Sequence, residues 1–396
     1  MGDFEALLDG FNSGNLVLPT ADRRNIVDLA NAIAYLIDVP DVPSSPNSAI
    51  LADLIGPTEH LVLVAADGLG MNMIQQVESG FIARHVVDTL STVFPSSTPV
   101  VFTSLATGLW PNQHAVMGWF THYSEIDCVA TTIRFVRRSD QKPLDELGLS
   151  TTEVFGETPL IQDSPRDSLS FLSPEEIAGS PFSNHTYGEE AQIGFKRFSE
   201  AANMVIHRLQ SASGPTYTFL YTAVVDTLAH RYGVGHERVL EAIRALDRDV
   251  ERLAVALPRD ARLVMTADHG HLDSGTKYEI WPSDPLVTLL NREPWGDDRV
   301  SQFDVASGRG AEFENEFTRR FGEDFYIVSI TDAERLHLFG PGEISPIARN
   351  RIGSYMAISK GSATLRYRYE GSHNHSQLAG HSGLTPDEMF VPMIVS

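Results

Sequence analysis

Cysteine is almost absent from this chain of 396 residues, since Cys128 is the only one. A single cysteine excludes an intramolecular disulfide framework and fits a reducing compartment. The sequence also lacks an apolar run long enough to span a membrane, and its first residues form neither the basic nor the apolar region of a secretory signal. We therefore expect a cytoplasmic protein without a membrane span.

Basic residues are also scarce. The chain has 30 lysine and arginine residues against 52 aspartate and glutamate residues, which gives a formal net charge of −22. A surface of this sign repels polyanions, so we expect neither a nucleic acid polymer nor an anionic membrane surface as a partner. If the substrate is a small anion, its attraction must come from a local feature such as a metal ion or a helix N-terminus.

Apolar runs of strand length lead to three aspartates. Residues 61–66 precede Asp67, residues 219–225 precede Asp226, and residues 263–267 precede Asp268. Runs of this length and β-branched content are typical of strands buried on both faces of a parallel sheet. Ligands bind outside the carboxyl ends of such strands, so the three carboxylates should converge on one rim.

Helical patterns alternate with these strands, at residues 199–210 and 236–256. The alternation predicts an α/β fold with a doubly wound, mostly parallel central sheet flanked by helices. Between residues 275 and 345, proline, glycine and tryptophan interrupt the pattern around a short β-α-β piece. We predict a catalytic core of residues 1–274 and 346–396 with a small inserted α+β cap of residues 275–345. The chain should re-enter the core at residues 354–359.

Histidines lie at or near the same places in the pattern. His230 follows Asp226 by four residues, His269 follows Asp268 directly, and His381 lies in a late Gly-His-Ser-Gly segment, where His373 and His375 are competitors. Three aspartates and three histidines are the ligand inventory of a two-metal hydrolase. Taken singly, an aspartate at a strand end is as often a turn or helix cap.

A hydroxyl residue opens a further predicted helix. Pro99 suits the first position of a helix and Gly108 suits the position after its end, which makes Thr98 the N-cap. Its hydroxyl would lie at the positive end of the helix dipole, beside free N–H groups that can bind phosphate oxygens. Seen alone, such a Thr-Pro is more often a plain N-cap than a nucleophile.

The order of these features resembles the alkaline phosphatase superfamily, and within it the type I phosphodiesterase and nucleotide pyrophosphatase branch. The matching stretches are Ala65-Ala-Asp67-Gly68, Thr98 through Thr107-Gly108-Leu-Trp-Pro-Asn-Gln-His114, Asp226-Thr-Leu-Ala-His230-Arg-Tyr-Gly233, Thr266-Ala-Asp268-His269-Gly270 and Gly380-His381-Ser-Gly383. They extend over most of the chain, apart from the first fifty residues and the insertion.

The resemblance implies a role for each matching residue. Two divalent metal ions are expected, usually zinc, with Mn²⁺ as the alternative. One ion would be bound by Asp226, His230 and His381. The other would be bound by Asp67, Asp268 and His269, together with Thr98 as the nucleophile. The implied reaction is attack of Thr98 on the phosphorus of a small phosphorylated substrate, followed by hydrolysis of a phosphothreonine intermediate by water.

One position departs from the resembling branch. The asparagine that commonly holds a phosphate oxygen, about twenty residues beyond the nucleophile, aligns here with Trp119. Tyr123, Asn112 and Arg134 are candidate replacements within plausible reach. Substrate preference is therefore the open part of the inference.

Several activities would use the same metal core. The leading hypothesis is hydrolysis of small phosphodiesters or nucleotide pyrophosphates, and the alternatives are a phosphomonoesterase or a phosphonate hydrolase such as phosphonoacetate hydrolase. A metal-dependent phosphomutase is disfavoured because no clear basic cluster lies near the site, and a sulfatase because its Cys/Ser-x-Pro-x-Arg signature is absent around Thr98. A rival of another class is a non-catalytic protein that binds a phosphorylated ligand.

Overall fold

A seven-stranded sheet forms the centre of the computed structural model, which describes residues 3–77, 79–156, 159–166, 168–371 and 377–396. His373 and His375 lie outside the described residues. The strands follow the order β2 (Val86–Ser91), β18 (Phe390–Val395), β9 (Ala261–Thr266), β1 (His60–Ala66), β8 (Thr216–Thr222), β6 (Ser168–Pro174) and β7 (Gln192–Phe195). All neighbours are parallel except β18, which is antiparallel to both β2 and β9. The predicted doubly wound, mostly parallel sheet is confirmed.

The register of the three central strands aligns their carboxyl ends. Ala66 of β1 pairs with Thr222 of β8, and Ala65 pairs with Thr266 of β9. The chain therefore leaves all three strands at one rim of the sheet, where the N–H of Asp67 donates to the carbonyl of Thr222 at 2.9 Å.

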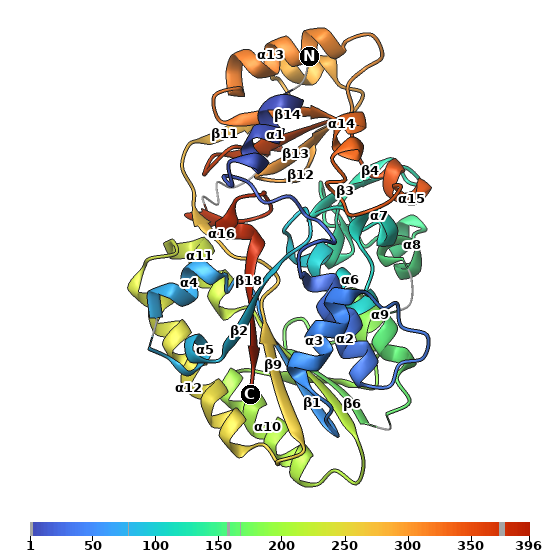
Figure 1. Cartoon of the computed structure of the whole chain (residues 1–396). Helices are drawn as coiled ribbons and strands as arrows, with labels where there is room; N and C mark the ends of the chain where they lie inside the picture. The colour runs from blue at the N-terminus through green and yellow to red at the C-terminus, as the bar shows by residue number, and fades with distance from the viewer. Residues whose placement is uncertain (1–2, 78, 157–158, 167, 372–376) are drawn as a thin grey trace.

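Helices pack on both sides of the sheet (Figure 1). One group contains α2 (Ile26–Leu36), α3 (Pro46–Ile55) and α6 (Thr98–Thr107), and the other contains α5 (Phe81–Arg84), α10 (Phe198–Gln210), α11 (Val224–Tyr232) and α12 (Glu237–Ala256). The apolar residues of α12 recur every three or four positions, and those from Val239 to Leu253 are buried against the core. This amphipathic pattern predicted helices at 199–210 and 236–256 close to their observed bounds.

A second, four-stranded antiparallel sheet lies at the opposite end of the molecule from the chain's C-terminus (Figure 1). Its order is β12 (Trp295–Asp297), β13 (Val300–Phe303), β15 (Tyr355–Ser359) and β14 (Phe325–Ser329), with α13 (Gly310–Phe321), α14 (Ile330–Arg335) and the N-terminal α1 (Phe4–Asn12) in contact with it. The prediction that residues 354–359 re-enter the core is wrong, because β15 pairs with β13 and β14. A short apolar segment fits either sheet, and only its partner strands determine which one it joins.

Smaller elements connect the two sheets. They are α4 (Met71–Ile74), α7 (Pro111–His114), α8 (Thr151–Phe155), α9 (Pro181–Tyr187), α15 (Pro346–Asn350), α16 (Pro386–Met389), the sheet of β3 (Phe120–Tyr123), β4 (Cys128–Thr131) and β5 (Val136–Arg137), and the strand pairs β10 (Leu272–Asp273) with β17 (Ala379–Gly380) and β11 (Lys277–Ile280) with β16 (Thr364–Tyr367). Short 3₁₀ turns occupy Gln75–Val77, Thr132–Arg134, Asp145–Leu147, Leu160–Asp163 and Pro285–Leu289. Within the described ranges, no helix has both the length and the apolar character needed to cross a bilayer.

Candidate metal centre and nucleophile

Asp67, Asp268 and His269 form one group of candidate metal ligands at the rim of the large sheet. Asp67 follows β1 directly, and the other two lie in the loop after β9. The Nε2 atom of His269 lies 3.1 Å from Asp268 Oδ2 and 3.6 Å from Asp67 Oδ1. All three side chains are almost completely buried.

A second group contains Asp226, His230, His271 and His381. Asp226 Oδ1 lies 3.2 Å from the Nε2 of His230, 2.9 Å from that of His271 and 3.9 Å from that of His381. The ring of His381 stacks on that of His269 with centroids 3.6 Å apart, so the two groups adjoin. Segments from four distant parts of the chain therefore meet at one place.

Asp226 reaches this place from a helix. The prediction of a strand over residues 219–225 ending at Asp226 is wrong at its end, since β8 stops at Thr222 and α11 begins at Val224. The first turn of a helix favours a carboxylate, and residues four apart share one helix face. The Asp-x-x-x-His spacing therefore places Asp226 and His230 together.

Backbone carbonyls fix the orientation of the three predicted histidine ligands. The Nδ1 atom of His230 donates to Ala379 O at 2.8 Å, that of His381 to Ser96 O at 2.9 Å, and that of His269 to Gly270 O at 3.2 Å. Each ring therefore directs Nε2 towards the carboxylates. An imidazole bound to metal is held in this way, with its second nitrogen donating to an acceptor.

The carboxylates fit a cation. Asp67 Oδ2 accepts from the Tyr221 hydroxyl and Asp268 Oδ1 accepts from the N–H of Gly68, whereas the buried Asp67 Oδ1 and Asp268 Oδ2 have no hydrogen-bond partner among the described residues. Buried carboxylate oxygens are normally paired or bound to a metal. Asp67 Oδ1 and Asp268 Oδ2 are therefore available as metal ligands.

The pKa shifts of these side chains also favour a bound cation. Burial and the neighbouring Asp268 and Asp226 carboxylates raise the pKa of Asp67 well above its usual value. Burial lowers the pKa of His269, but the Asp268 and Asp226 carboxylates and the hydrogen bond to the Gly270 carbonyl together raise it overall. The carboxylates thus repel one another and attract a positive charge, which a divalent cation would supply.

Thr98 lies beside the first group of ligands. Its Oγ1 is 3.3 Å from His269 Nε2, and the residue is 7 % exposed. The helix over Thr98–Thr107 and the left-handed Gly108 after it agree with the sequence, but the N-cap is Ser97 rather than Thr98. Thr98 is instead the first helical residue, because the Ser97 backbone is extended and its carbonyl already accepts from Val101 N–H at 3.0 Å.

His271 belongs to the site although sequence reasoning did not select it. It is completely buried, and its Nε2 donates to Asp226 Oδ1 at 2.9 Å. The available signal was its place two residues beyond His269 on the same rim loop. The resemblance assigns a full ligand set without His271, so that spacing alone does not predict its role.

The candidate substrate contacts are distributed differently. Trp119 is half-buried directly before β3, and its backbone N–H donates to Asp297 Oδ2 at 3.1 Å. Tyr123 is completely buried with the Arg351 guanidinium over its ring, and Asn112 donates to the carbonyls of Pro341 and Glu343. For Tyr123 and Asn112, these contacts indicate structural roles.

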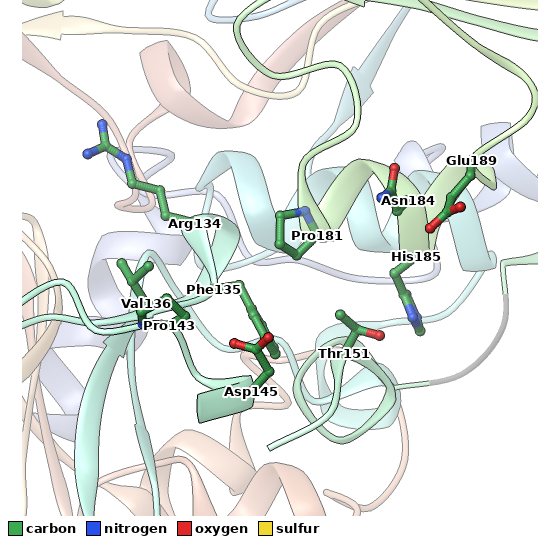
Figure 2. A pocket seen from close by; sticks show the side chains of 10 residues that line it. All are labelled: Arg134, Phe135, Val136, Pro143, Asp145, Thr151, Pro181, Asn184, His185 and Glu189. Atoms are coloured by element: carbon green, nitrogen blue, oxygen red, sulfur yellow. The ribbon is translucent and has the colours of Figure 1, made fainter. Parts of the chain in front are cut away.

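Arg134 lines a separate cavity of about 550 Å³ (Figure 2). The side chains of Asp145, Thr151, Asn184 and Glu189 surround the same cavity, and its lining contains none of the candidate metal ligands. Arg134 is thus not part of the cluster around Thr98.

The fold and the rim cluster together define a class, the metal-dependent α/β hydrolases of the alkaline phosphatase superfamily. Comparison with protein families identifies the branch: the model of the type I phosphodiesterase / nucleotide pyrophosphatase family matches residues 61–380. The chain belongs to this family of metal-dependent hydrolases. No curated protein is significantly similar in sequence.

Solved structures share the fold. Murine ectonucleotide pyrophosphatase / phosphodiesterase 5 superposes with a TM-score of 0.61 at 14 % identity, over 84 % of this chain and 87 % of the murine chain. An inactive variant of that protein, with threonine replaced by alanine, was solved in complex with AMP. Phosphonoacetate hydrolase from Sinorhizobium meliloti 1021, in complex with phosphonoformate, gives a TM-score of 0.61 at 15 % identity over 84 % of this chain and 89 % of the other.

Proposed function

We propose that this enzyme hydrolyses small phosphodiesters or nucleotide pyrophosphates with Thr98 as the nucleophile. The observation that carries the proposal is the position of Thr98 Oγ1, 3.3 Å from His269 Nε2 and beside two adjoining groups of carboxylates and imidazoles. In this reaction the Thr98 oxygen forms a bond to phosphorus and the bond from phosphorus to the leaving oxygen breaks. Water then cleaves the bond between the Thr98 oxygen and phosphorus, which releases the phosphate with its remaining ester group and restores the hydroxyl.

The ligand assignment follows the two groups. Asp226, His230 and His381 would bind one divalent ion, and Asp67, Asp268, His269 and Thr98 would bind the other. Mixed nitrogen and oxygen ligands favour zinc, with Mn²⁺ as the alternative. Two such ions supply Lewis acidity and four positive charges against three carboxylates, which would let this rim accept phosphate despite the acidic surface.

The chain's own residues prepare the reaction. Ser96 and Ala379 carbonyls orient His381 and His230, and Tyr221 holds one oxygen of Asp67. The almost complete burial of Asp67, Asp268 and His269 keeps water away from their side chains. These contacts fix the groups before substrate arrives, which lowers the cost of reorganisation during reaction.

Two further assignments belong to the proposal. We infer a cytoplasmic location from the single cysteine, which fits a reducing compartment. We also propose that an inserted cap begins at residue 275, on a core that includes residues 1–274. The pairing of β15 with β13 and β14 supports a cap that extends beyond residue 345.

Replacement of the nucleophile tests the activity. Thr98→Ala should lower kcat on bis-p-nitrophenyl phosphate at least about 1000-fold in zinc-loaded protein, because covalent catalysis is lost. Thr98→Ser retains a hydroxyl and should keep measurable turnover. Mass spectrometry of wild-type protein quenched with acid during turnover of this diester should detect a p-nitrophenyl phosphoryl group on Thr98, because only one p-nitrophenol has left. Equal rates for the wild type and Thr98→Ala would remove Thr98 from the mechanism.

A phosphonate hydrolase is the second candidate, because the similarly folded phosphonoacetate hydrolase was solved with phosphonoacetate. Parallel assays on bis-p-nitrophenyl phosphate, p-nitrophenyl phosphate and phosphonoacetate separate the diesterase, monoesterase and phosphonatase. Turnover of none of these by protein that contains two metal ions per chain would favour the non-catalytic binder.

A further inference from the structure

The turn between β12 and β13 brings two charged side chains to the rim of the large sheet. Asp297 pairs with Val300 in this hairpin, so Asp298 and Arg299 form the turn itself. Asp297 is 9 % exposed and Arg299 is 1 % exposed. Burying charges is costly unless each is paired, so their partners indicate why the turn carries them.

Arg299 reaches the loop that carries His381 through one buried carboxylate. Its Nε donates to Glu388 Oε1 at 2.5 Å and its Nη2 donates to Glu388 Oε2 at 3.1 Å, which is a bidentate pair between two fully buried side chains. Glu388 Oε1 also accepts from the N–H of Gly383 at 2.7 Å, two residues beyond His381. This ion pair thus links the second sheet to the histidine loop.

The backbone of Glu388 extends this contact to the other histidine loop. Its carbonyl accepts from the N–H of Gly270 at 2.9 Å, between His269 and His271. The Arg299–Glu388 pair therefore lies within one hydrogen bond of both rim loops that carry candidate metal ligands.

Asp297 reaches the nucleophile side of the site. Its Oδ1 accepts from the Ser97 hydroxyl at 2.9 Å and its Oδ2 accepts from the N–H of Trp119 at 3.1 Å. A side chain at Gly118 would approach Asp297 Oδ2 to 2.8 Å, so glycine leaves the room that this contact needs. The Ser97 hydroxyl makes this bond to Asp297 and no hydrogen bond that caps helix α6.

We propose that this turn positions the reaction centre: Arg299, through Glu388, fixes the loop of His381, and Asp297, through Ser97, fixes the start of the helix that carries Thr98. This role rests on the proposed function, in which His381 binds a metal ion and Thr98 attacks phosphorus. Asp297 and Arg299 are positioning residues, since they act through Ser97 and Glu388.

Metal affinity tests the Arg299 arm. Arg299→Lys keeps the charge but loses the bidentate geometry. We expect the variant to bind one of two zinc ions about 10- to 100-fold more weakly than wild type, the range typical for groups that support metal ligands. Zinc titration of metal-free protein and the visible spectrum of the Co²⁺ form would measure this without any activity assay.

Arg351→Lys is the matched control. Arg351 is equally buried and donates to the carbonyls of Ala115 and Val154, away from both histidine loops. The Arg351→Lys substitution should lower the melting temperature without changing zinc affinity. The role of Arg299 would be overturned if Arg299→Lys bound zinc as tightly as the wild type. It would also be overturned if Arg351→Lys lost as much zinc affinity as Arg299→Lys. Wild-type protein that binds no zinc would instead remove the proposed function itself.

Asp297→Asn tests the other arm and remains informative if Arg299→Lys fails to fold. Asparagine has a single acceptor oxygen and cannot accept from both Ser97 and Trp119 in the same way. We expect zinc affinity and KM to stay at the wild-type values while kcat falls about 10- to 100-fold, as for a displaced reacting group. An unchanged kcat, or a loss of zinc binding, would contradict the assignment.

Discussion

At the scale of single residues, a hydrogen bond from His271 orients the candidate metal ligand Asp226. His271 supports Asp226 from a completely buried position, and its ring fills the space where a Cβ at Gly68 would lie, 2.7 Å from His271 Nε2. Burial and the neighbouring His230 lower the pKa of His271 to about 4, so the ring is neutral at physiological pH. A neutral imidazole with its proton on Nε2 donates to the carboxylate, which orients Asp226.

Replacement of His271 should therefore weaken one metal site. We expect His271→Ala to reduce the affinity for one zinc ion about 10- to 100-fold, and His271→Gln, whose amide can donate to Asp226, to recover part of it. Competition titrations with a chromophoric chelator would measure both. Wild-type affinity in the alanine variant would show that the hydrogen bond does not matter. A much larger loss that glutamine fails to restore would indicate a direct ligand.

His114 predicts a pH dependence away from the metal cluster. It is completely buried in α7, accepts from Val116 N–H through Nδ1 and donates to the Ser104 hydroxyl through Nε2. Burial, with a contribution from the Arg351 charge, lowers its pKa from 6.5 to about 3. The folded state thus favours neutral His114. The stability this contributes is complete above pH 6.5 and is lost as the pH falls towards 3.

His114→Asn should make unfolding less sensitive to acid. Between pH 8 and pH 5, the difference in the free energy of unfolding between wild type and variant should shrink by about 2 kcal/mol. The reason is that His114 takes up a proton in this range only when the wild type is unfolded. This uptake lowers the free energy of unfolding of the wild type by about 1.4 kcal/mol for each pH unit below the ordinary histidine pKa. Urea unfolding of the metal-free proteins at several pH values would measure this. A difference that stays constant over this range would show that His114 also titrates normally in the folded state.

At the scale of elements, the start and end of a segment were harder to predict than its presence. The helix after Ser97 was predicted to its last residue because proline and glycine mark its ends. The boundary before Asp226 was missed because Ala223-Val224-Val225 is as apolar and β-branched as the strand before it. Local sequence does not show that these residues begin a helix, because tertiary packing, in which Val225 of α11 is buried, determines it.

The loops after β1 and β9 also depend on glycine where they meet. A Cβ at Gly270 would lie 2.0 Å from the carbonyl oxygen of Asp387 and 2.9 Å from the Cα of Gly70. Gly270→Ala should therefore displace the loop of His269 and destabilise the protein by about 1–3 kcal/mol. Gly214→Ala, where nothing lies within 4 Å, is the control and should change stability by about 0.5 kcal/mol or less. Equal unfolding midpoints in urea for the two variants would contradict the packing argument.

At the scale of the whole molecule, the sequence predicted which chemical groups converge but not how the second sheet contributes to them. Asp67 and Asp268 follow the ends of two paired strands that the apolar runs predict, whereas Asp226 reaches the site from the first turn of a helix. The contacts of Asp297 and Arg299 follow from pairings between strands far apart in the chain, and no local pattern specifies such partners. For the same reason, Arg299–Glu388, which spans 89 residues of sequence, could not be predicted.

The convergence of distant segments on one cluster couples metal binding to the stability of the whole molecule. Without cations, Asp67, Asp226 and Asp268 bring three carboxylates together in a mostly buried site, and burial together with their repulsion raises the pKa of Asp67. Ions that bind only the folded state add stability by mass action, about 4 kcal/mol at a free concentration 1000-fold above Kd. Chelator-treated protein should therefore melt at a lower temperature, and added zinc should raise the melting temperature with the logarithm of its concentration. Mg²⁺ prefers oxygen ligands and should have little effect at a site rich in histidine. A melting temperature that does not respond to zinc, while His230 and His381 are intact, would show that these side chains do not bind it.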